Sequence, residues 1–142
     1  MNLSNDVKIT KVAVAAVSAG TEVLGSILDM QGYEGVAFIT SIATANAGNL
    51  LKVKQDDDSA MGSPADLEGS GVVATANAEV VFADVYQPTK RYVRASVIRA
   101  GANTAVGEIY AIQYKPKVMP VDNSVTDIIV GAVLVSPDEG VA

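Results

Sequence analysis

The kind of apolar residue in this sequence is its strongest constraint on the fold. The chain has 22 Val and 9 Ile against 7 Leu, and 5 Tyr and 2 Phe are its only aromatic residues. Val and Ile have stiff side chains that suit a pleated sheet, whereas Leu predominates in helical cores. This composition indicates an all-β protein with a light core of small side chains.

Short segments in which apolar and polar residues alternate, separated by turn residues, support this interpretation. In residues 36–42, for example, one face carries Val36, Phe38, Thr40 and Ile42, which is typical of a strand. Residues 22–30 fit either a helical stripe or a strand, and a central Gly favours the strand. The strands predicted in this way are residues 8–17, 22–30, 36–42, 50–55, 79–86, 91–99, 108–114 and 127–135.

Short strands at this spacing are typical of an antiparallel sandwich or barrel, and the length fits one domain. We predict a single-domain, jelly-roll-like antiparallel β-sandwich over residues 1–142. Residues 1–6 are expected to form a flexible or partner-binding N-terminal arm. Residues 117–142, in which prolines follow the last clear strand, are expected to form a C-terminal arm or strand.

Two connections carry more specific signals. The short stretch 87–90 predicts a hairpin between the strands on either side of it. The acidic stretch that follows Asp58 contains Ser63 and Pro64. Such a pair is typical of a helix start, so we expect a surface loop with at most one or two helical turns, which would end at Gly69.

The sequence lacks Cys, His and Trp. Disulfides, thiolate nucleophiles and Cys-based metal sites are thereby excluded, as are the commonest general base and metal ligand. The run Asp56-Asp57-Asp58 has Met61 and Leu67 where an EF-hand requires Gly and Glu. We therefore expect no enzyme, cofactor or metal site, and whether the Asp56–Asp58 loop binds a cation stays open.

The net charge of −6 is unevenly distributed along the chain. Residues 55–89 carry −7, residues 90–117 carry +5 and residues 118–142 carry −4. The overall acidity argues against nucleic acid as a partner, although Tyr residues interleave the basic block. No segment resembles a signal peptide or a membrane-spanning helix, so we also expect no membrane partner. A basic and an acidic patch on one protein suit contact with its own copies or with an oppositely charged protein.

Four segments resemble, in order, a family of small structural proteins of tailed bacteriophages. These are DMQGYEGVAF (Asp29–Phe38), QPTKRYVR (Gln87–Arg94), AIQYKPK (Ala111–Lys117) and VSPDEG (Val135–Gly140). The resemblance implies a virion component, in the first place a capsid decoration or cement protein on the outer surface of the head. Such a protein is made in the host cytoplasm, and its partners are the major capsid protein and its own copies, for example in a trimer.

Partner contacts are expected at the polar N-terminus, on the basic strand and at the start of the C-terminal arm. The predicted partner-binding residues are Asn2, Leu3, Ser4, Asn5, Arg91, Arg94, Arg99, Lys115 and Lys117. Two alternatives remain at this point. One is another virion part, such as a tail, neck or head-fibre protein. The other is a sandwich that binds carbohydrate or a cell surface, against which the absence of Trp counts.

Overall fold

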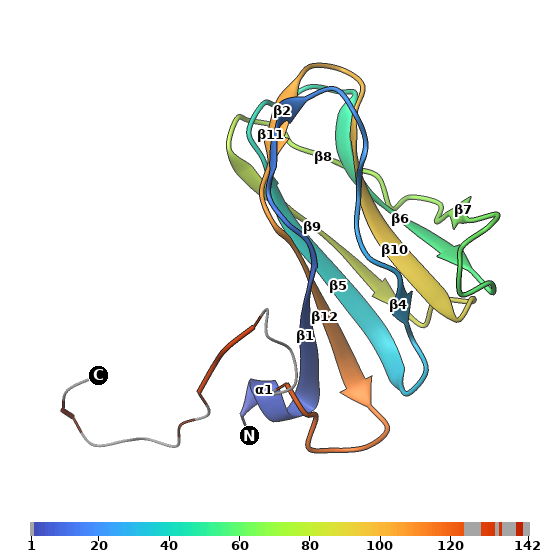
Figure 1. Cartoon of the computed structure of the whole chain (residues 1–142), viewed down its shortest axis with the longest axis vertical. Helices are drawn as coiled ribbons and strands as arrows, with labels where there is room; N and C mark the ends of the chain where they lie inside the picture. The colour runs from blue at the N-terminus through green and yellow to red at the C-terminus, as the bar shows by residue number, and fades with distance from the viewer. Residues whose placement is uncertain (1, 124–128, 133, 135–138, 141–142) are drawn as a thin grey trace.

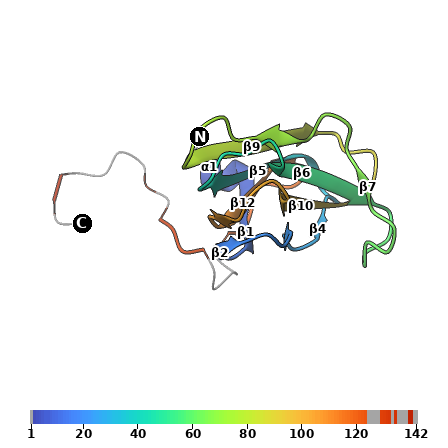
Figure 2. The ribbon, with the colours of Figure 1, turned by 90° about the horizontal axis from the view of Figure 1, so that it is seen from above.

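The computed structural model describes residues 2–123, 129–132, 134, 139 and 140. Two antiparallel sheets pack face to face as a β-sandwich, and the described residues form one short helix, α1 (Leu3–Asp6) (Figure 1). Seen from above, the sheets form two layers side by side (Figure 2). This confirms the all-β sandwich that the sequence predicts.

We call the two layers sheet A and sheet B. Sheet A contains β1 (Val7–Ala13), β2 (Ala16–Ala19), β5 (Tyr33–Ile42), β9 (Glu79–Tyr86), β11 (Thr104–Val106) and β12 (Ile109–Pro116). Sheet B contains β3 (Val23–Leu24), β4 (Leu28–Asp29), β6 (Asn49–Asp56), β7 (Ala65–Asp66), β8 (Val72–Val73) and β10 (Tyr92–Arg99).

The order of the main strands is that of a jelly roll. In sheet A, β12 lies between β1 and β5, and β9 pairs with the other side of β5. In sheet B, β10 lies between the short strands β3 and β4 and the long strand β6, which also pairs with β7 and β8. The chain thus passes repeatedly from one sheet to the other, as in two interlocked Greek keys.

The core lies between the sheets and follows the alternation in the sequence. On β5 the predicted inner residues Val36, Phe38, Thr40 and Ile42 are all buried, and β10 buries Val93, Ala95 and Val97. Phe38 is the one aromatic residue among the largest fully buried side chains of the described part. The expected light core of small side chains is therefore found.

Two predicted strands are each divided in the structure. Residues 8–17 become β1 and β2, which pair with different strands, and the β1 register shifts between Lys11 and Ala13. Residues 22–30 become β3 and β4, which both pair with β10. Between them the Gly25 amide donates to the Ala95 carbonyl at 2.9 Å, and a Cβ at Gly25 would lie 2.9 Å from that oxygen. This close backbone approach explains the Gly that the sequence places there.

The predicted hairpin and the predicted helical turns are both wrong. β9 pairs with β5 and β10 pairs with β6, so the connection 87–90 crosses between the sheets. Residues 65 and 66 form β7 on the edge of β6 instead of a helix. The Asp56 carboxylate accepts a hydrogen bond from the Ser63 amide at 3.0 Å, which folds the acidic loop back toward β6.

The described parts of the two predicted arms contact each other. Residues 3–6 form α1, and the Asn5 carbonyl accepts a hydrogen bond from the Val121 amide at 2.8 Å. The start of the C-terminal segment is thus held against the N-terminus. The strand expected at 127–135 lies partly outside the described residues, and its described residues 129–132 and 134 form no strand.

Candidate partner-binding site

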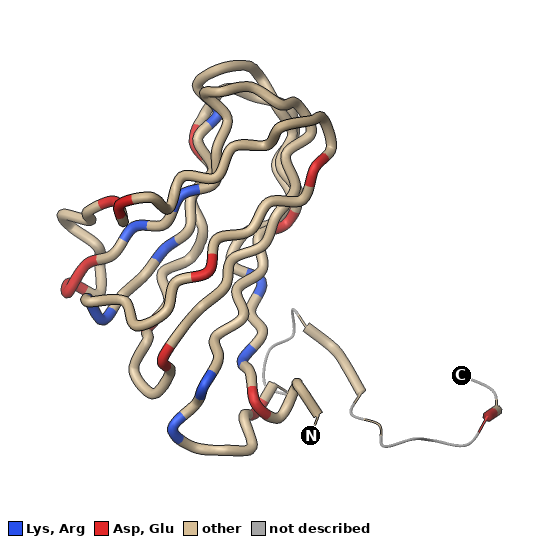
Figure 3. Tube along the Cα trace, turned by 180° about the vertical axis from the view of Figure 1, so that it is seen from behind, with Lys and Arg blue, Asp and Glu red and all other residues tan. Residues whose placement is uncertain are grey.

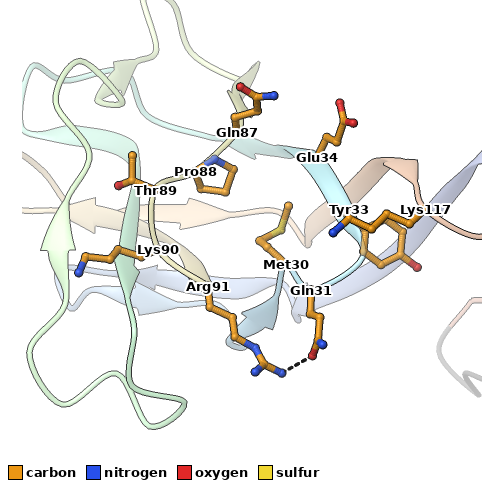
Figure 4. A pocket seen from close by; sticks show the side chains of 10 residues that line it. All are labelled: Met30, Gln31, Tyr33, Glu34, Gln87, Pro88, Thr89, Lys90, Arg91 and Lys117. Atoms are coloured by element: carbon orange, nitrogen blue, oxygen red, sulfur yellow. Dashed lines mark hydrogen bonds between the residues drawn. The ribbon is translucent and has the colours of Figure 1, made fainter.

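A polar hollow of about 500 Å³ lies at one end of the sandwich, between the β4–β5 connection and the β9–β10 connection (Figure 4). Residues 29–38, 87–94 and 111–117, three of the four segments singled out in the sequence, meet here although they are far apart in the chain. The lining residues are Met30, Gln31, Tyr33, Glu34, Gln87, Pro88, Thr89, Lys90, Arg91 and Lys117. Most of these side chains are polar, so the hollow can offer both hydrogen-bond donors and acceptors.

Turn chemistry shapes both walls of the hollow. Gly32 has a φ of 91° in the β4–β5 turn, a conformation that Gly adopts without strain. On the opposite wall, Gln87 has a φ of 53°, and its backbone amide donates to the Glu34 carbonyl at 2.7 Å. The Met30 amide donates to the Arg91 carbonyl at 2.9 Å. These backbone bonds join the two connections, so the hollow has a fixed frame.

An ion pair closes one side of the hollow. The Arg91 guanidinium donates to both oxygens of Asp29, at 2.9 and 2.7 Å, and also to the Gln31 side-chain oxygen at 2.5 Å. The hydrogen bond from Arg91 holds the pKa of Asp29 below its ordinary value. Arg91 therefore lies at the predicted site, but its charge is already neutralised by a residue of the same chain.

Lys117 is the basic residue of the hollow whose charge is available. Its backbone amide donates to the Gly32 carbonyl at 2.8 Å. Within the described part of the chain, its side chain makes no hydrogen bond or ion pair. Lys90, by contrast, forms an ion pair with Asp57. Lys117 can therefore offer a positive charge to a partner at little cost.

An apolar groove of about 600 Å³ lies next to the hollow, at the same end of sheet A. Leu3, Val7, Tyr114 and Met119 supply its apolar walls, and Lys115 and Lys117 lie at its border. Lys115 lies 4.6 Å from the centre of the Tyr86 ring and 3.7 Å from the Glu34 carboxylate. The structure thus brings together three predicted residues, Leu3, Lys115 and Lys117.

Two predicted basic residues lie elsewhere. Arg99 is 5% exposed, and its guanidinium donates to the carbonyls of Val17 and Thr104 at 2.8 and 2.9 Å and to Thr21. It therefore holds the far end of the sandwich together and does not lie on the surface. Arg94 lies on the outer face of sheet B, opposite Lys54 on β6.

The polar N-terminal residues are held by the C-terminal segment. The Asn2 side chain donates to the Leu134 carbonyl at 3.2 Å, and the Ser4 carbonyl accepts from Asn123 at 2.8 Å. The Asn5 carbonyl is already occupied by Val121. A free N-terminal arm, ready to pair with a neighbour, is therefore not found at residues 2–5.

The charge blocks of the sequence do not become separate poles. Lys52 pairs with Asp66 at 2.9 Å and Lys54 pairs with Glu22 at 3.1 Å. Basic and acidic segments consequently lie interleaved around the molecule (Figure 3). Head-to-tail attraction between a basic and an acidic end is not supported by this arrangement.

The acidic loop satisfies its carboxylates with its own backbone. Asp56 accepts from the amides of Asp58 and Ser63, and Asp58 accepts from those of Ala60 and Gly62. Among the residues that the structure describes, no cluster of three or more acidic side chains could hold a metal ion. The same residues include no helix long and apolar enough to cross a membrane.

Sequence reasoning missed the uncharged part of the hollow. Gln31, Gln87 and Thr89 lie in turns, and nothing in their local sequence distinguishes them from ordinary turn residues. The one signal that could have found them is their place inside residues 29–38 and 87–94, two of the segments singled out in the sequence.

No protein-family model and no curated protein sequence matches the chain. Among solved structures, the PBSX exported protein XepA has a similar fold, with a TM-score of 0.60 over 94% of this chain. The two share 16% sequence identity, and this chain spans 45% of that chain, so the likeness concerns the fold alone. The β-sandwich fold is thus similar to that of a PBSX exported protein.

Two further structures are similar at a TM-score of 0.46. One comes from work describing Bacillus endospore appendages as disulfide-linked pili, with 15% identity over 78% of this chain and 89% of that chain. The other is the SPBc2 prophage-derived protein YomS, with 13% identity over 76% of this chain and 94% of that chain.

Proposed function

We propose that this protein is a non-enzymatic structural component of a phage particle, made in the host cytoplasm and bound to the outer surface of the head. There it acts as a decoration or cement protein that contacts the major capsid protein through the polar hollow. The observation that carries this proposal is the convergence of the phage-like segments. Residues 30–34, 87–91 and 117 come from three of them and line one hollow.

The chemistry of the hollow suits a protein surface. Gln31, Gln87 and Thr89 can donate to and accept from exposed backbone groups, and Lys117 can pair with a carboxylate. Arg91 and Lys90 are already paired with Asp29 and Asp57. The electrostatic attraction of a partner to the hollow therefore comes from Lys117 and not from a large basic surface. The jelly roll shared with XepA supports a phage origin at the level of the fold only.

Binding to a capsid multiplies a weak contact. An oligomer that engages several identical capsid subunits gains effective concentration at every site after the first. A single hollow of modest affinity is therefore sufficient for high occupancy on a particle.

The proposal is tested with particles purified from cells that carry the phage and express the tagged full-length chain. We expect hundreds of copies on each head, and we expect the Lys117→Glu variant to bind about tenfold more weakly because it reverses the available charge. The matched control is Lys52→Glu, which makes the same charge change on the outer face of sheet B. Both variants are first checked for wild-type thermal stability.

Each other outcome contradicts part of the proposal. If Lys52→Glu loses binding and Lys117→Glu keeps it, the contact lies on the outer face of sheet B. If the particle holds only a small ring of copies, the protein belongs to the neck, tail or a fibre. If the protein is found in the medium and never in particles, the role on the capsid is wrong.

A further inference from the structure

The outer face of sheet A, which points away from sheet B, is strongly apolar. Four of the chain's aromatic residues lie on it, and the register places Ile39 between Phe82 and Tyr110 and Ala37 beside Ile112. Val80 and Phe82 on β9 are 68% and 63% exposed. The apolar members of this face are Ile9, Ala37, Ile39, Val80, Phe82, Tyr86, Tyr110, Ile112 and Tyr114.

The outer face of sheet B provides an internal comparison. There Lys52 on β6 pairs with Asp66 on the neighbouring β7, and Lys54 reaches past β10 to Glu22, next to β3, so the surface stays polar. An antiparallel sheet with one solvated side normally presents such polar residues. A continuous apolar surface of aromatic and branched side chains is instead typical of an interaction site.

Few charged groups lie on or beside the outer face of sheet A, and most are paired within the chain. Lys11 pairs with Glu108 at 3.3 Å, and Lys115 lies 3.7 Å from Glu34. Asp84, opposite Ala37 in the register, has no cationic partner among the described residues and accepts a hydrogen bond from the Tyr114 hydroxyl at 2.7 Å. One carboxylate is a small share of this face, and a largely apolar face is typical of contacts between identical subunits.

The same surface contains both a projecting group and a recess. Phe82 projects from β9 at one side, and the apolar groove formed by Leu3, Val7, Tyr114 and Met119 opens at the end of β1 and β12. Strand spacing and rise place the two roughly 17 Å apart on one face. A two-fold axis midway between them, near Ala37, would bring Phe82 of each copy into the groove of the other.

The area of the face is compatible with such a contact. Four strands at about 4.8 Å spacing and some seven residues at about 3.3 Å rise cover roughly 450 Å² in projection. Projecting side chains and the adjoining groove make the accessible area larger than this projected area. The accessible area therefore approaches the roughly 800 Å² per partner of a stable interface. We infer that the outer face of sheet A binds a second copy of this chain in a two-fold dimer. This inference stands independently of the proposed function.

The test is the mass of the full-length protein in solution, measured by sedimentation over a range of concentrations. We expect a dimer for the wild type and a dissociation constant raised roughly 30-fold or more by Phe82→Glu, which removes the aromatic side chain that enters the groove of the other copy. The control Leu24→Glu adds the same charge to an apolar residue on β3, outside sheet A, that is 51% exposed. It is expected to remain dimeric.

A second measurement uses the absence of Cys from the sequence. Ala37→Cys introduces a single thiol near the predicted axis. Because facing sheets lie about 10 Å apart, a bis-maleimide reagent that spans this distance should link two copies, whereas Leu24→Cys should stay unlinked. A monomeric wild type overturns the inference, and so does a Phe82→Glu protein that dimerises normally. If the wild type is monomeric in solution and Phe82→Glu nevertheless abolishes binding to particles, the outer face of sheet A contacts a different protein.

Discussion

Arg91 donates two hydrogen bonds to the carboxylate of Asp29, from Nε to Oδ1 at 2.9 Å and from Nη2 to Oδ2 at 2.7 Å. The two residues are far apart in the sequence, and their pairing joins the end of β4 to the start of β10. A bidentate arrangement of this kind fixes orientation as well as proximity. It therefore sets the position of one wall of the polar hollow.

This pair predicts a specific sensitivity to acid. Because the pKa of Asp29 is lowered in the folded state, its contribution to stability is present above its unfolded value of about 3.8 and is lost as the pH falls through the folded value. Asp29→Asn should therefore show a shallower loss of unfolding free energy between about pH 5 and pH 2. Urea unfolding across this range measures the slope, with Asp66→Asn, which alters a more exposed carboxylate, as the control.

A wild-type slope in Asp29→Asn would show that the pair with Arg91 does not contribute to the folded state. Both partners are close to half exposed. We therefore expect a modest effect, visible in the slope more clearly than in the midpoint at neutral pH.

Arg99 is predicted to be the most important basic residue for stability. Its replacement by Leu would leave the carbonyls of Val17, Thr21 and Thr104 without the donors that they now have, two in part-buried positions and that of Thr104 in a buried one. The expected cost is about 3 kcal/mol of unfolding free energy or more. Arg94→Leu is the matched control, because Nε of Arg94 has no hydrogen-bond partner among the described residues. Equal losses in the two variants would refute the structural role of Arg99.

Gly35 is predicted to be required by the Tyr114 ring. A Cβ at Gly35 would overlap the ring and hydroxyl of Tyr114. In Gly35→Ala the ring must move, which costs about 1 to 2 kcal/mol and breaks the hydrogen bond to Asp84. Gly71→Ala, where the nearest side-chain atom is 3.4 Å from the added Cβ, is the control.

The same variant has a spectroscopic signature. Burial, together with the hydrogen bond to Asp84, raises the pKa of Tyr114 above its ordinary value of 10.0. A raised value means that the neutral phenol stabilises the fold at pH values below about 10 and that this contribution disappears as the pH rises further. Gly35→Ala should lower this pKa, and absorbance titration of the phenols should then show one group ionising earlier. An unchanged titration curve would mean that the ring has not moved.

Asn49 provides a test that depends on a single atom. Its side-chain amide donates to the carbonyls of Thr44 and Ala102 at 3.1 and 3.0 Å, and it is fully buried. Asn49→Asp would replace this donor with a charged oxygen and should cost about 3 kcal/mol or more. Asn77→Asp is the control, since Asn77 only accepts a bond, from the Ala45 amide at 2.9 Å. Similar urea midpoints for the two variants would contradict the assignment.

The strands were predictable where alternation is strong and local. The inner residues of β5 and β10 follow directly from their sequences, because one face of each strand is buried and the period is two. The sheet that each strand joins depends on pairings between distant segments. The connection after Tyr86 therefore looked like a hairpin, although it crosses between the layers.

The candidate site was predictable only through its charges. Lys115 and Lys117 stand out in the sequence and do lie at the hollow and groove, whereas Arg99 stands out equally and is buried. The remote carbonyls of Val17 and Thr21, with that of Thr104 nearby in the sequence, satisfy Arg99, and no local pattern reveals the remote partners. The apolar outer face of sheet A was missed because its residues alternate with the core residues and resemble an ordinary strand pattern.

The position of β12 has a consequence for synthesis. It is the last strand of sheet A in the sequence, yet it lies between β1 and β5. While the chain is being made, β1 has no neighbour in the main part of the sheet until residues 109–116 leave the ribosome. Closure of this sheet must therefore be a late event that joins distant segments, and such folds form slowly. Until then, a newly made chain would expose the unpaired edges of β1 and β5. Correct folding therefore depends on each chain inserting its own β12 between them before the β12 of a neighbouring chain does.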